Sequence, residues 1–231
     1  MTTKNTLLWL PLAVLLGACG DNSGSAASLS VMHSASCIAD YAQRACDLLT
    51  PELVAGVYVD LPDDVNSEET AATRSCQHSW PGERTQLLKA GNIEMEVPLR
   101  NRVGISWIEK KKDAESAEAW FRHVYRTLSA EEKAATLAAL DKELEKQTAG
   151  LSEVQKELAG SFGRDLINAN RYETIEGVGT AAAWDANPLS PTLKVLSGDT
   201  EFGIEADISA DSSVNRDLAI ALARAVIAAC P

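Results

Sequence analysis

The chain has 231 residues and a formal net charge of −12, from 33 acidic and 21 basic side chains. A negative field of this size repels nucleic acid and anionic lipid head groups, so a nucleic-acid partner is not expected. The length suits one domain with a well-buried core, and the regular spacing of apolar residues argues against disorder.

Residues 1–18 have the pattern of an export signal. Lys4 precedes an apolar run over residues 7–16, which ends in Gly17-Ala18 before Cys19. Ten to twelve apolar residues, rising about 1.5 Å each, cannot cross a hydrocarbon core of roughly 30 Å, so the segment is not an anchor helix. Leu16-Gly17-Ala18-Cys19 resembles the lipobox of bacterial lipoproteins. The resemblance implies cleavage before Cys19 and a lipid on its sulfur.

Residues 19–34 are small and polar, which predicts a flexible tether leading into a domain over residues 35–231. Acyl chains, at about 0.8 kcal/mol per buried methylene, would hold the protein at a membrane through Cys19. In bacteria with two membranes, an aspartate after the lipidated cysteine resembles an inner-membrane retention signal. Gly20 holds that position, so we expect the periplasmic face of the outer membrane, with the inner membrane or cell surface as alternatives.

Four further cysteines predict two disulfides in an exported chain. The apolar spacing between Ile38 and Leu49 predicts one amphipathic helix, on which Cys37 and Cys46 would lie about 13 Å apart on opposite faces. A disulfide needs Cα atoms within about 7 Å, which excludes that pair. Of the two remaining pairings we favour Cys46 with Cys76 and Cys37 with Cys230. No Cys-x-x-Cys motif suggests redox catalysis.

Thr50-Pro51 predicts the start of a short helix, with Thr50 as N-cap. The acidic and polar residues 61–74 predict a loop. Alternating residues predict a strand over 75–80, ended by Pro81-Gly82, and another over 102–108. In the second strand Val103, Ile105 and Trp107 should share one face, and Ile108 breaks the pattern.

Asp113 is a candidate N-cap for a helix whose apolar stripe is Ala117, Trp120, Phe121, Val124, Tyr125 and Leu128. Ser129 and Glu132 form a capping box that predicts a further helix. Leucines continue from there at near-heptad spacing to Leu158, which favours core packing. Gly150, followed by Ser152 and Gln155, predicts a helical hairpin. We therefore interpret residues 129–165 as a helical insertion.

The last third predicts a turn at Gly177-Val178-Gly179, a strand over 181–184 and a β-hairpin turning at residues 197–200. A closing helix should span residues 215–229. The whole order predicts an α+β fold, with helices packed on an antiparallel sheet.

The motifs Cys46-Asp47-Leu48-Leu49-Thr50, Cys76-Gln77-His78-Ser79-Trp80 and Gly177-Val178-Gly179-Thr180-Ala181-Ala182 resemble those of a loose group of exported bacterial lipoproteins of uncharacterised function. The resemblance covers about half of the mature chain. It implies a small α+β sandwich and supports the pairing of Cys46 with Cys76. The chain departs from the group's pattern in its longer helical block, and the group brings no catalytic residues.

Candidate chemistry is sparse. Gly-x-Ser-x-Gly is absent, and His33, His78 and His123 lack metal-ligand spacing. The acidic residues 63–69 lack calcium-loop spacing. We therefore expect no cofactor, no metal and no catalytic set. The expected function is a non-enzymatic envelope lipoprotein that binds a ligand or partner protein, with the helical block as interaction element. An envelope hydrolase with an unrecognised site is the alternative.

Overall fold

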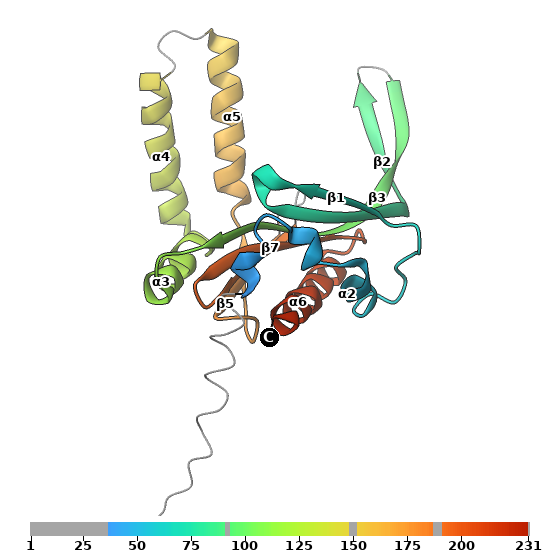
Figure 1. Ribbon diagram of the computed structural model, residues 1–231. Helices are drawn as coiled ribbons and strands as arrows, with labels where there is room; N and C mark the ends of the chain where they lie inside the picture. The colour runs from blue at the N-terminus through green and yellow to red at the C-terminus, as the bar shows by residue number, and fades with distance from the viewer. Residues whose placement is uncertain (1–36, 91–92, 148–151, 187–190, 231) are drawn as a thin grey trace, which may run out of the picture.

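One seven-stranded antiparallel sheet organises the structure, in the strand order β1-β2-β3-β7-β6-β5-β4 (Figure 1). The computed structural model describes residues 37–90, 93–147, 152–186 and 191–230. The predicted signal, Cys19 and the tether lie outside these residues. The expectation of an α+β fold is confirmed.

The strands are β1 (Asn66–Thr70), β2 (Ser75–Ala90), β3 (Ile93–Lys110), β4 (Tyr172–Ile175), β5 (Ala181–Asp185), β6 (Thr192–Ser197) and β7 (Thr200–Asp207). The helical elements are η1 (Ala45–Asp47), α2 (Pro51–Ala55), η2 (Ala71–Thr73), α3 (Ala114–Val124), α4 (Ala130–Gln147), α5 (Glu153–Ala169) and α6 (Ser212–Ala229). None of the helices in the described ranges is both long and apolar enough to span a bilayer.

The main core lies between α6 and one face of the sheet, which we call the core face. Strand alternation brings Ile105 of β3 and Ile204 of β7 to this face, and both are fully buried. Leu222 of α6 packs in the same core. In Figure 1, α6 and α2 lie below the sheet, while α4, α5 and the far end of β2 and β3 rise above it.

The predicted helix over residues 38–49 is wrong as a continuous element. Residues 37–40 are helical, a turn follows, and a separate 3-10 helix covers Ala45–Asp47. The break lies at Arg44, which has φ −147° and ψ 54°. Two disulfides hold the segment at both ends, joining Cys37 to Cys230 and Cys46 to Cys76 with Cα atoms 5.6 and 4.9 Å apart. A straight helix would turn its two cysteines to opposite faces, whereas the break lets both reach the domain.

Four predicted helix starts are confirmed, because each cap depends only on nearby residues. The side chain of Thr50 accepts a hydrogen bond from the Leu53 N–H, and that of Asp113 accepts one from Ser116. The capping boxes of Ser129 with Glu132 and of Ser152 with Gln155 are both formed. The second pair opens α5, so the predicted helical hairpin is also confirmed.

The predicted loop over residues 61–74 contains an unexpected strand. Asn66–Thr70 forms β1, which pairs with β2 at the edge of the sheet. All five of its residues are exposed, so the strand carries no apolar alternation that could have marked it.

The predicted ends of the two central strands are also wrong. β2 continues beyond Pro81-Gly82, through a bulge between Pro81 and Thr85, and β3 begins at Ile93. A second bulge, between Ser106 and Glu109, shifts β3 by one residue against β7. Trp107 therefore faces solvent at 58% exposure and Ile108 is buried, the reverse of what alternation predicts.

The late strands match expectation, apart from β4, which was not predicted. β6 and β7 form the predicted hairpin, with Ser197 opposite Thr200 and Gly198 in the left-handed region at φ 60°. Gly177 and Gly179 have φ of 73° and 58°, which confirms a turn there. The closing helix begins at Ser212, three residues earlier than predicted.

Candidate functional site

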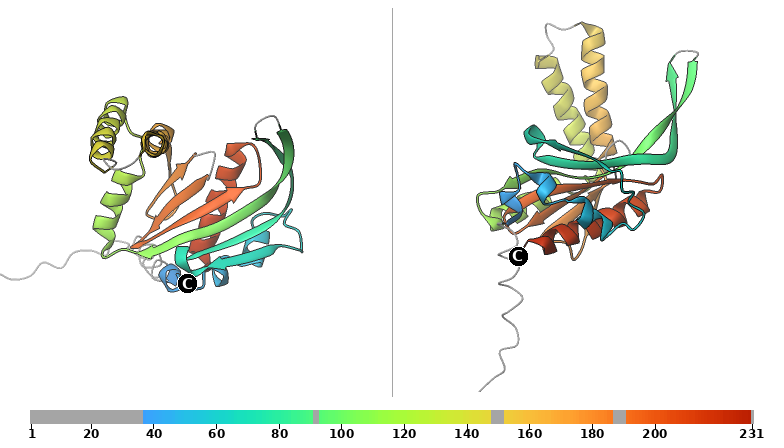
Figure 2. Two further views of the ribbon diagram at one scale, coloured as in Figure 1. Left: turned by 90° about the horizontal axis from the view of Figure 1, so that it is seen from above. Right: turned by 45° about the vertical axis from the view of Figure 1, so that its right-hand side comes forward.

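The face of the sheet opposite α6 is covered only in part. Ala117 and Phe121 of α3 are buried against Ala181, Ala183 and Leu196, in a second and smaller apolar cluster. This cluster covers the β4-β5-β6 end of the sheet. Side chains of β1, β2, β3 and β7 that point to the same side of the sheet as this cluster form what we call the open face. The left view of Figure 2 looks down on this side of the ribbon.

A buried polar contact holds α3 to the sheet. The hydroxyl of Tyr125 donates to the Glu201 carboxylate at 2.5 Å, and Lys111 lies 2.9 Å from the same carboxylate. Burial and the Glu201 carboxylate raise the pKa of Tyr125 well above its usual value, so the phenol stays protonated as the donor. This contact fixes the end of α3 on the sheet, next to the point where α4 begins.

The α4–α5 hairpin is an appendage whose two ends are tied together. Thr127 donates its hydroxyl hydrogen to the Tyr172 carbonyl at 2.8 Å and accepts the Tyr172 N–H at 2.9 Å. The Leu128 N–H donates to the side chain of Asn170 at 2.8 Å. Above this base the helices pack mainly on each other, as Figure 1 shows.

Glycines on α5 allow the close approach of α4. A Cβ on Gly160 would lie 3.5 Å from Leu144, and one on Gly163 would lie 2.8 Å from Leu140. The predicted role of Leu158 in that packing is wrong, because its side chain is 70% exposed. The helix turns it away from α4.

Three large apolar side chains on α5 have no cover in the structure. Leu158, Phe162 and Leu166, which we call the α5 stripe, are 70%, 65% and 51% exposed. A spacing of four residues places them along one side of the helix, with Leu158 and Phe162 turned more than 90° away from Gly160 and Gly163. All the views place α4 on one side of α5 and the β2–β3 hairpin on the other. The stripe therefore lies on a part of α5 that α4 leaves uncovered, and α5 itself stands between α4 and that hairpin.

The second projection, which we call the β-arm, is the part of β2 and β3 beyond the bulge, residues 85–90 and 93–98. Arg84 fixes its direction: the guanidinium donates to the side chain of Asp207 at 2.5 Å and to its carbonyl at 2.6 Å. The β-arm also carries exposed apolar side chains. Leu87, Leu88 and Met95 are 52%, 46% and 57% exposed.

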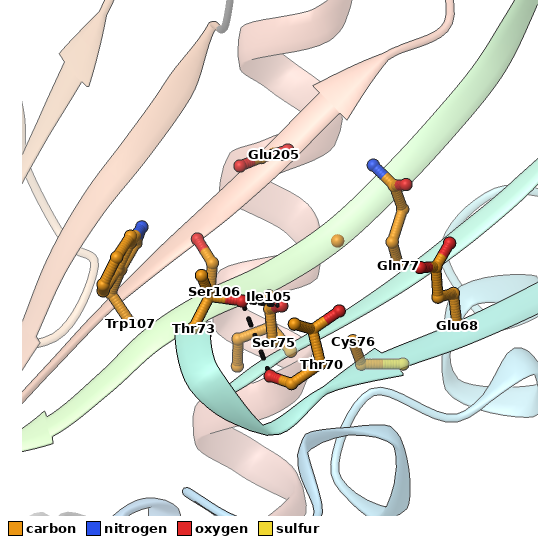
Figure 3. A pocket seen from close by; sticks show the side chains of 11 residues that line it. Glu68, Thr70, Thr73, Ser75, Cys76, Gln77, Ile105, Ser106, Trp107 and Glu205 are labelled. Carbon is orange, nitrogen blue, oxygen red and sulfur yellow. Dashed lines mark hydrogen bonds between the residues drawn. The ribbon is translucent and has the colours of Figure 1, made fainter.

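Polar side chains form the floor between the α5 stripe and the β-arm. Two hollows lie on this floor and share Gln77, with volumes of about 210 and 460 Å³. The larger is lined by Arg100 and Arg102, among others. The smaller surrounds Gly104 and is shown in Figure 3. The site is thus a broad polar surface between two partly apolar projections, and not one enclosed cavity.

The residues predicted as sites lie elsewhere. Cys19 is outside the described residues, and both disulfides belong to the core-face side. His78 is fully buried, with Nδ1 2.8 Å from the Ser67 hydroxyl and Nε2 2.5 Å from the Leu49 carbonyl. A carbonyl only accepts hydrogen bonds, so Nε2 carries the proton. His78 thereby links the N-terminal segment to β1 and β2.

Across the described ranges, no three or more His, Cys, Asp and Glu side chains gather closely enough to hold a metal ion. The open face was missed by sequence reasoning, which found the helical block but not the β-arm. The four-residue spacing of Leu158, Phe162 and Leu166 is the signal that could have marked this surface; of the three, only Leu158 was expected to pack in the core.

No protein-family model, curated protein or solved structure matches this chain.

Proposed function

We propose that this chain is a lipid-anchored protein of the bacterial cell envelope, held through Cys19, whose domain binds a partner protein on its open face. The observation that carries the partner-binding part is the α5 stripe, where three large apolar side chains are exposed on a helix that rises from the same side of the sheet as the open face. Burying each such side chain is worth about 1.5–3 kcal/mol, so a protein surface that covers the stripe gains affinity. The lipobox and tether support the anchor.

The shape of the surface favours a helical segment of a partner. An i, i+4, i+8 row is the pattern with which one helix packs along another, and the row is about 12 Å long at 1.5 Å per residue. The polar floor argues against a lipid surface as occupant, because charged groups such as Arg102 would lose their water. Cys37, the first described residue, is bonded to Cys230 at the end of α6, on the side of the sheet opposite the open face.

Site-specific crosslinking in cells that produce the full chain tests the proposal. A photoreactive phenylalanine analogue replaces Phe162, and the matched control replaces Lys142, which is exposed on the side of α4 away from α5. We expect a crosslinked partner from position 162 only, and its loss when Leu158 and Leu166 are both changed to Ser. Equal products from both positions would overturn partner binding. A crosslink to a second copy of this chain would replace the partner by a dimer.

The anchor is tested separately. Mass spectrometry of the N-terminal peptide should find a diacylglycerol on Cys19, and Cys19→Ala should release the protein from the membrane fraction. An unmodified mature N-terminus at another residue would overturn the lipoprotein assignment.

The hydrolase alternative is supported by one contact, the 2.8 Å separation between the Ser67 hydroxyl and His78 Nδ1. A serine hydroxyl beside an imidazole nitrogen is the arrangement that a serine nucleophile requires. If this pair is catalytic, a fluorophosphonate probe labels the wild-type protein and not the Ser67→Ala variant. Absence of labelling in both removes this alternative.

A further inference from the structure

The smaller hollow on the open face has an acidic lining. Glu68, Gln77, Gly104 and Glu205 form a lateral row across four strands, because each is the direct partner of the next. Gln77 and Glu205 are the partners of Gly104 on its two sides, and Figure 3 shows their side chains separated by a gap. Glycine has no side chain, so the gap between them, two strand spacings or about 10 Å, stays open above the backbone.

Polar groups around this gap lack partners in the described part of the chain. Ser106 is 7% exposed, and its buried hydroxyl has no hydrogen-bond partner there. Within the same described residues, Gln77 and Glu205 form no side-chain hydrogen bond or ion pair. Two residues further along β3 and β7, by contrast, Arg102 forms an ion pair with Asp207 at 3.4 Å. Buried polar groups are normally paired, so an unpaired hydroxyl in the lining indicates a group that a ligand can satisfy.

An exposed aromatic ring completes the lining. Trp107 has φ 56°, which is a strained backbone for an L-residue, and the bulge turns its indole out to 58% exposure beside Ser106. Strain of this kind persists where the surrounding structure imposes it, often at ligand sites. No ring contact covers the indole in the described chain.

We propose that this pocket receives a basic side chain of the partner, most fittingly an arginine, an inference that rests on the proposed function. A guanidinium stacks on an indole face and donates several hydrogen bonds in one plane. The Glu205 carboxylate and the Ser106 hydroxyl supply acceptors, and Glu68 adds a second negative charge at the edge. The lining contains no lysine or arginine.

A lysine beside the pocket allows a second test, in which the expected change in affinity has the opposite sign. Lys194 lies opposite Gly203, which in turn lies opposite Ser106. Its ammonium group is 3.7 Å from the place where a Cβ on Gly203 would stand, outside the pocket lining. A positive charge there opposes a cationic ligand, so its removal should strengthen binding, whereas removal of Glu205 should weaken it.

The experiment uses the purified protein and two peptides, acetyl-Gly-Arg-Gly-amide and its citrulline isostere, which keeps the shape and loses the charge. Binding is followed on the indole N–H NMR signal of Trp107, assigned with Trp107→Phe. We expect the arginine peptide to shift this signal and to bind about tenfold more tightly than the citrulline peptide. Glu205→Gln should weaken the arginine peptide about tenfold. Lys194→Gln should tighten it, and Glu131→Gln on α4 should change nothing.

Equal affinity for the two peptides, or an unchanged affinity in Glu205→Gln, would overturn the pocket's role. Failure of the proposed function looks different. If the partner still crosslinks at position 162 when Glu205 is Gln, with undiminished yield, partner binding stands and the arginine pocket is overturned. If the arginine peptide binds as expected but position 162 gives no crosslink, the pocket is supported and the α5 stripe is overturned as a partner contact.

Discussion

The guanidinium of Arg74 donates a hydrogen bond of 3.2 Å to the carbonyl oxygen of Ile108, which joins the start of β2 to the bulge in β3. Arg74 and Trp107 are the non-glycine residues with positive φ in the described chain, at 48° and 56°. One strained residue therefore braces the position next to the other. The hydrogen bond from Arg74 thus helps to hold Trp107 in its outward-facing conformation. The energetic cost of that conformation can be tested by measuring the free energy of unfolding.

Trp107→Gly should leave the free energy of unfolding unchanged or raise it by up to about 1 kcal/mol. Glycine adopts positive φ without the cost of about 1–2 kcal/mol that a Cβ incurs, and this relief offsets its extra loss of backbone entropy, about 0.5–1 kcal/mol. Urea denaturation measures the change. The control Ile108→Ala removes a fully buried side chain and should cost about 2–5 kcal/mol. A loss above about 2 kcal/mol for Trp107→Gly would show that the indole stabilises the fold.

Removal of the Cys37–Cys230 disulfide should destabilise the domain more than removal of Cys46–Cys76. The two bonds close loops with sequence separations of 193 and 30 residues, and the chain-entropy model assigns them about 5 and about 4 kcal/mol. Paired Cys→Ala variants, measured in denaturant without reductant, give both values. A larger loss for the shorter loop would mean that native packing around Cys46 outweighs the entropy of the unfolded chain.

Replacement of residues 130–169 by a short Gly-Ser linker should leave a folded domain. The helices pack mainly on each other, and the bonds between Thr127 and Tyr172 keep the cut ends adjacent. We expect cooperative thermal unfolding within a few degrees of the parent and the same dispersed indole NMR signals. Unfolding on deletion would instead make the hairpin part of the core.

The start of α4 should loosen in acid. Two hydrogen bonds from Arg126, at 2.8 and 2.6 Å, and one from the Ser129 N–H lower the pKa of Glu132 to about 2. The folded value lies below the ordinary value of 4.5, so this stabilisation is present above about pH 4.5 and is lost as the pH falls toward 2. Amide NMR signals of residues 129–133 should report the change between pH 6 and pH 2. Glu132→Gln should abolish that dependence, whereas Glu131→Gln should keep it.

Local signals in the sequence were dependable where nearby residues settle the outcome. The four caps, the β6–β7 hairpin and the glycine turn at residues 177–179 all depend on contacts within a few residues. The edge strand β1 was missed because its side chains are all exposed, and only pairing with β2 makes it a strand. The same applies to the β-arm, whose pairing resumes after a bulge braced by Arg84 and Asp207.

By itself the sequence determined the α+β class and the helical hairpin, because periodicity and capping are written in neighbouring residues. It also predicts the export signal and lipid site at Cys19, which lie outside the described residues. Only the tertiary structure decided which faces are left uncovered. Whether Leu158 is buried against α4 or left exposed depends on where Gly160 and Gly163 bring the two helices together. Whether Trp107 or Ile108 is buried depends on one bulge, set by the register of β3 against β7. Such choices are made by contacts between residues far apart in the chain, which no local pattern records.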